Sequence, residues 1–103
     1  MSIIQQLFPG YARNWYVLRD ALNDVGAECE NWSYEQLDRS AEEQPLLERK
    51  VEGGTVCFTI DRWDKRPNGD LVISIDADGL PTLGGVKPSY QFAKRVDGSV
   101  YYP

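Results

Sequence analysis

Two aspartates, Asp61 and Asp76, come closest to a pair of residues that could carry out chemistry. Each follows an alternating apolar run, so they could oppose each other on neighbouring strands, and two carboxylates that flank a cleft can do acid–base work. However, Arg62 follows Asp61 directly, and Asp76 stands where its strand runs out. Solvated positions explain both side chains, so we predict no catalytic residue and expect that the protein is not an enzyme.

Metal and cofactor chemistry finds little support in the residue types. The chain has no histidine, which removes the commonest general base and a frequent metal ligand. Cys29 and Cys57 lie outside any CxxC spacing, zinc held by thiolates alone would need more of them, and we expect both to be buried or idle. Residues 76–79, Asp-Ala-Asp-Gly, lack the later oxygen ligands of a calcium loop and indicate a turn. We therefore expect no metal and no cofactor.

The acidic residues are distributed unevenly. The formal net charge is −5, yet the segment from Asp20 to Glu48 holds nine carboxylates against Arg39 alone, a charge of −8 that leaves +3 for the rest. Binding to nucleic acid needs the opposite sign, so we expect no direct contact with nucleic acid. A docking surface for a basic protein fits this charge, although exposed helix faces that keep the protein soluble would also explain it. The expected partner-binding residues are Asp24, Glu28, Glu30, Glu35, Asp38 and Glu42.

Two helices must position these carboxylates. Apolar residues recur at spacings of three and four between Tyr11 and Val25, which predicts an amphipathic helix over 11–25 that Gly26 closes. Ser33 and Gln36 fit a capping box, and Pro45 disfavours helix in the residue before it, so the second helix is expected to run to about Gln44. A short lead-in helix is expected over residues 2–8.

From residue 46 the apolar period changes to two, which is typical of strands. Strands are expected over 46–51, 55–63, 70–76, 89–96 and 99–102, with turns at Gly53-Gly54, Asn68-Gly69 and Asp97-Gly98. The predicted fold is α+β, a single domain over 1–103 with two N-terminal helices packed on a four- or five-stranded antiparallel meander. Trp63 ends the second strand on its non-core face, as a binding contact or as cross-strand packing beneath a helix.

The expected compartment is the cytoplasm. The first six residues lack the basic start and apolar stretch of a secretory signal, and no apolar run is long enough to span a bilayer, so we expect no membrane contact.

A small acidic domain without catalytic residues, closed by a strand pair over 87–103, resembles the immunity proteins of bacterial polymorphic toxin and contact-dependent growth inhibition systems. The resemblance is one of class, size and charge over the whole chain. It implies a protein that binds one cognate toxin domain, often a basic nuclease, and occludes its active site. The alternative is a non-catalytic structural or regulatory module, such as a phage or secretion-system accessory protein, that works through its sheet edge or as an oligomer.

Overall fold

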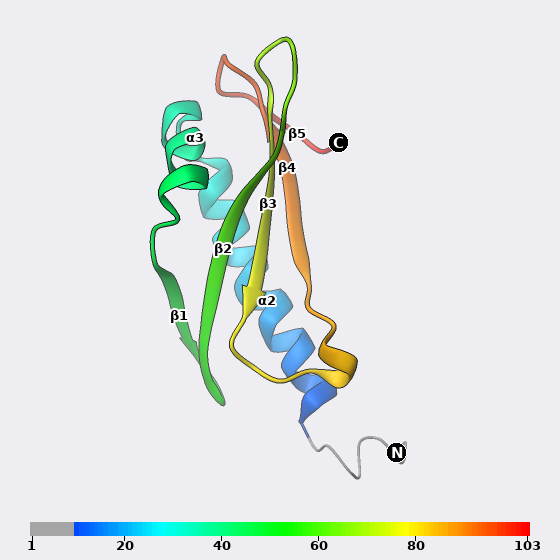
Figure 1. Ribbon diagram of the computed structural model, residues 1–103. Coiled ribbons are helices and arrows are strands. Elements are labelled where there is room, and N and C mark those ends of the chain that lie inside the picture. The colour runs from blue at the N-terminus through cyan, green and yellow to red at the C-terminus, as the bar shows by residue number, and fades with distance from the viewer. Residues whose placement is uncertain (1–9) are drawn as a thin grey trace.

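The computed structural model describes residues 10–103, so the lead-in helix expected over 2–8 lies outside the described residues. Two helices come first and five strands follow (Figure 1). The elements are α2 (Tyr11–Glu30), α3 (Tyr34–Glu43), β1 (Leu47–Val51), β2 (Gly54–Lys65), β3 (Leu71–Asp78), the short 3₁₀ turn η1 (Leu83–Gly85), β4 (Ser89–Lys94) and β5 (Val100–Tyr101).

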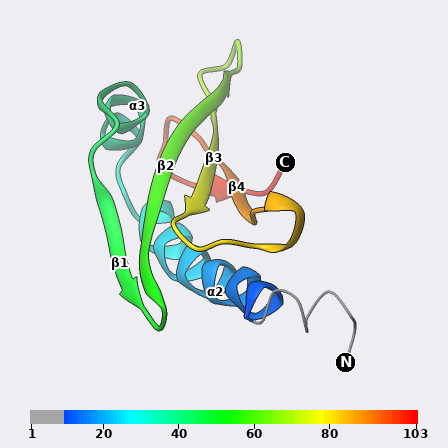
Figure 2. The same cartoon turned by 60° about the horizontal axis from the view of Figure 1, so that its bottom comes forward.

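The five strands form one antiparallel sheet in the order of the sequence. Figures 1 and 2 show α2 lying across one face of this sheet, with α3 beyond one end of β1. The predicted α+β class, with two helices followed by an antiparallel meander, is therefore confirmed, and the sheet has five strands. Among residues 10–103, no helix combines the length and the apolarity needed to cross a bilayer.

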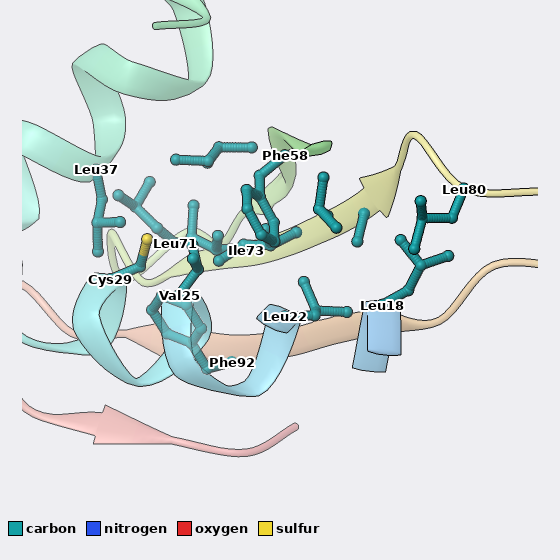
Figure 3. Close-up of a cluster of buried hydrophobic side chains, with 14 residues drawn as sticks. Leu18, Leu22, Val25, Cys29, Leu37, Phe58, Leu71, Ile73, Leu80 and Phe92 are labelled. Atoms are coloured by element: carbon teal, nitrogen blue, oxygen red, sulfur yellow. The ribbon is translucent and has the colours of Figure 1, made fainter. Parts of the chain in front are cut away.

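The core lies between α2 and the helix-facing side of the sheet (Figure 3). A stripe on α2 is buried against alternate residues of β2, β3 and β4, because side chains of a strand point to its two faces in turn. The opposite face of the sheet has no helix on it in the described part of the chain and carries exposed polar residues at several positions, as antiparallel sheets permit. The buried side chains include Leu18, Leu22, Val25, Cys29, Leu37, Val56, Phe58, Ile60, Leu71, Ile73, Ile75 and Phe92.

The second helix begins and ends where the sequence predicts. The Ser33 hydroxyl oxygen accepts a hydrogen bond of 3.1 Å from the backbone N–H of Gln36, which satisfies one of the unpaired donors of the first turn. At the other end Gln44 takes a left-handed conformation with φ of 50°, directly before Pro45. These local signals mark both ends of α3.

The strand predictions hold within a few residues at each end. β2 continues two residues past Trp63, and the register shifts between Arg62 and Asp64, where Trp63 forms a bulge and is 66% exposed. Packing of Trp63 beneath a helix is therefore wrong, since a bulged residue leaves the regular pairing. The last strand is shorter than expected and covers only Val100–Tyr101.

The prediction that Gly26 closes the first helix is wrong. The helix continues through Gly26 to Glu30, and Gly26 is buried in its interior. A Cβ placed on Gly26 would lie 2.6 Å from the ring of Tyr90 on β4, closer than real side chains approach. The glycine therefore permits a close approach of helix and strand, a reason that no sequence pattern within the helix reveals.

This contact predicts that Gly26→Ala destabilises the protein. Alanine favours a helix by about 1 kcal/mol over glycine, but displacing the Tyr90 ring costs about 1–3 kcal/mol of overpacking strain. We expect the free energy of unfolding, measured by urea denaturation, to fall by up to about 2 kcal/mol. In a Tyr90→Ala background the same substitution should be neutral or stabilising. An equal loss in both backgrounds would show that the ring is not the obstacle.

Candidate functional site

The six carboxylates expected to form one docking surface lie in three separate places. Asp24 and Glu28 line the flank of α2 that faces β1, whereas Glu30 lies on the other flank, toward β4 and the C-terminal residues. The remaining three, Glu35, Asp38 and Glu42, belong to α3. The structure therefore brings Asp24 and Glu28 together and separates them from the others.

Three of these carboxylates are paired with arginines from the sheet. The Arg49 guanidinium on β1 donates to both carboxylate oxygens of Glu28 at 2.6 Å. On β2, Arg62 forms ion pairs with Asp38 and with Glu42, the latter at 3.3 Å. Lys65 adds a second cation to Asp38 at 3.6 Å, and the Asp38 bond, followed by that to Glu42, raises the pKa of Arg62. These pairs join the helices to the sheet and leave less free negative charge than the sequence count indicates.

Glu30 has a structural role at the end of α2. Its carboxylate accepts a hydrogen bond of 2.5 Å from the Tyr102 hydroxyl, and its backbone carbonyl accepts one of 2.6 Å from Lys94 Nζ. Burial, and then the hydrogen bond and charge of Glu30, raise the pKa of Tyr90 well above its usual value, so that ring stays neutral. Glu30 thus holds the C-terminal residues against the helix.

A groove runs between α2 and β1, and it is the most distinctive concave feature near the acidic residues. One hollow of about 320 Å³ is lined on α2 by Val17, Asp20, Ala21 and Asp24, and on β1 by Arg49, Lys50 and Val51. A second hollow of about 200 Å³ shares Arg49 with the first and is also lined by Glu28, Trp32 and Leu47. The lining thus combines apolar side chains with carboxylates four residues apart on α2 and with the cations Arg49 and Lys50 on β1.

Asp24 is the free carboxylate on the α2 side of this groove. Asp20 bonds to Arg19 at 3.1 Å and Glu28 to Arg49, whereas Asp24 is exposed and has no cation within 4.0 Å among residues 10–103. Asp24 is among the partner-binding residues expected from the sequence, whereas its neighbours Asp20 and Arg49 are not. The i, i+4, i+8 spacing of Asp20, Asp24 and Glu28 places them on one helix flank and was a usable signal.

The aspartate pair lies on the open face of the sheet. Asp61 is directly opposite Ser74, and Asp76 is opposite Thr59, so the two aspartates are diagonal neighbours. Burial raises the pKa of Asp76, and the charge and hydrogen bond of Asp61 raise it further. The two aspartates therefore lie close together on neighbouring strands, as the sequence predicts. However, the Asp76 side chain is exposed and lines none of the grooves described above.

The remaining candidate groups hold no clustered ligands. Among residues 10–103, no three Cys, Asp or Glu side chains lie close enough to hold a metal ion. The Asp78 carboxylate accepts a hydrogen bond of 2.8 Å from the backbone N–H of Gly79 and forms an ion pair of 3.3 Å with Lys87. Burial raises the pKa of the Cys29 thiol to about 12, so it stays protonated. Cys57 is exposed, so of the two thiols expected to be buried or idle, Cys29 is the buried one.

Comparisons with known proteins found no matching family model, no matching curated protein and no matching solved structure.

The aspartate pair predicts a pH-dependent gain in stability for Asp76→Asn. Because the folded-state pKa of Asp76 is raised, its stabilising contribution is present below the unfolded pKa and is lost as the pH rises through the folded pKa. At pH 7 the substitution should therefore raise the free energy of unfolding, by a few tenths of a kcal/mol for so exposed a pair. Thermal unfolding from pH 3 to pH 7 should show the gain vanishing at the acid end.

Asp78→Ala, on the same strand, serves as a control of opposite sign. The N–H of Gly79, and then Lys87, lower the pKa of Asp78, so its contribution is present above the unfolded pKa and is lost as the pH falls. This variant should be less stable than the parent at pH 7. If Asp76→Asn also lost stability at pH 7, the two aspartates would not repel each other.

Proposed function

We propose that the protein is a non-catalytic binding module of the immunity type, which inhibits a toxin domain by covering its active site. Its contact surface would be the groove between α2 and β1, with Asp24 as the central carboxylate. The single observation that carries this proposal is the acidic α2 side of the groove beside the apolar Val17 and Ala21, with Asp24 left without a cation within 4.0 Å in the described residues 10–103.

The chemistry of the groove favours a basic protein segment. A lysine or arginine side chain can lay its aliphatic stem on Val17 and Ala21 while its charged end reaches Asp24. A desolvated ion pair of this kind increases affinity when it lies at the centre of an interface. Carboxylates at the rim chiefly increase the association rate. The net charge of −5 adds a long-range attraction to any cationic partner.

The class-level resemblance makes a toxin the partner to test first. Nuclease toxins bind phosphates with basic residues, so carboxylates at the inhibitor surface would stand where substrate phosphates otherwise lie. The alternative from the sequence, a structural or regulatory module, differs in its expected assembly. Such a module would bury the α2–β1 groove itself in a stable oligomer, so Asp24→Lys should break that oligomer in light scattering coupled to size-exclusion chromatography.

The test is binding to toxin domains encoded beside this gene, with Asp24→Lys as the variant. We expect the parent protein to bind one such domain and to abolish its activity. Asp24→Lys should weaken binding about 30-fold or more in calorimetry, the loss typical of reversing a central interfacial charge. The Asp24 side chain is exposed, so the substitution leaves the core packing intact, which circular dichroism checks.

Glu35→Lys is the matched control, since it reverses an equally exposed carboxylate on α3, away from the groove. We expect it to change affinity by no more than about threefold, with most of the change in the association rate. Equal losses for both variants would reject the groove as the contact surface. If no neighbouring toxin domain bound and all kept full activity, the inhibitor function itself would be rejected.

A further inference from the structure

The outer edge of β1 leaves unpaired main-chain groups at one side of the sheet. β1 is the first strand in the sheet order, and among residues 10–103 no backbone hydrogen bond from another segment reaches Glu48 or Lys50. The two-residue turn makes Val51 and Gly54 a hydrogen-bonded pair. From there, hydrogen-bonded and non-hydrogen-bonded pairs alternate along β1 and β2. The main chains of Leu47, Arg49 and Val51 therefore face β2, whereas those of Glu48 and Lys50 face outward.

The side chains on this edge have opposite charges in a symmetric order. Leu47 and Val51 pack against the core, so the alternation places Glu48 and Lys50 on the open face of the sheet, where both are exposed. Arg49 stands midway between them. A two-fold axis at Arg49 would therefore set each Glu48 opposite Lys50 of the second copy, at the two positions whose main chains face outward.

We propose that β1 pairs with β1 of a second copy of this chain, antiparallel and centred on Arg49, to form one continuous sheet of two five-stranded halves. A two-fold interface must be complementary to itself. This edge is self-complementary both in its main-chain hydrogen-bonding groups and in its charges. The inference does not depend on the proposed function.

The charges also select the register. An axis at Lys50 would set two lysines opposite each other, and an axis at Glu48 would set two glutamates opposite each other, both of which are unfavourable. Charged residues on an edge strand usually discourage pairing with foreign strands. Here the same charges discourage all but the one register that matches them.

The helix-facing side of this seam is compatible with the pairing. Leu47 would lie opposite Val51 of the second copy, an apolar pair. The two Arg49 side chains would meet at the axis, but each guanidinium is already held by Glu28 of its own chain at 2.6 Å. The seam would run along the β1 side of each α2–β1 groove, because Arg49, Lys50 and Val51 line that groove.

Charge exchange tests this pairing with the intact protein. On β2, the residues opposite Glu48 and Lys50 are the uncharged Cys57 and Thr55, so reversing either charge disturbs no ion pair among residues 10–103. By analytical ultracentrifugation at concentrations up to about 1 mM, the parent protein should dimerise. Glu48→Lys and Lys50→Glu should each weaken the dimer about tenfold or more, and the double exchange should restore it to within about threefold of the parent.

Glu48→Pro provides a second, charge-independent variant. It removes an outward N–H and leaves the bonds to β2 in place, which an edge strand tolerates, and it should abolish the dimer. A parent protein that is monomeric throughout, a dimer that persists in Glu48→Pro, single exchanges that change nothing, or a double exchange as weak as the single ones would each overturn the proposal.

Discussion

The packing of the α2 stripe on the helix-facing side of the sheet is the contact on which the other features depend. In the part of the chain that the structure describes, α2 covers one face of the five-stranded sheet, and the main cluster of buried apolar side chains lies between the two. The close approach at Gly26 brings α2 against β4, and this position leaves β1 outside the strands that the helix covers most closely. The groove and the open strand edge are both consequences of where α2 lies.

Ion pairs between the helices and the sheet change the meaning of the acidic segment. By composition, residues 20–48 carry a large excess of carboxylates, which suggests one anionic face. In the folded chain Arg49 and Arg62, which lie outside that segment, neutralise Glu28, Asp38 and Glu42. Exposed pairs of this kind contribute little to stability, yet they decide where free negative charge remains. The free charge in the groove is concentrated at Asp24.

Local patterns predicted much of the fold because the signals act over a few residues. The capping serine, the residue before Pro45 and the change of apolar period at residue 46 each depend on neighbouring residues only, and the structure agrees with all three. The helix end at Gly26 failed for the opposite reason, since a glycine inside a helix and a glycine that ends one look alike until its distant neighbour Tyr90 is known.

The sequence by itself determined the class of the fold, the strand order of a meander and the shortage of groups for acid–base and metal chemistry. Those properties follow from periodicity, turn residues and residue types, which no long-range contact can alter. Only the tertiary structure decided which carboxylates keep their charge free, that Asp24 lines a groove beside apolar side chains, and that the outward groups of β1 carry charges in symmetric order. Each of these depends on which segments, distant in the chain, come to lie side by side.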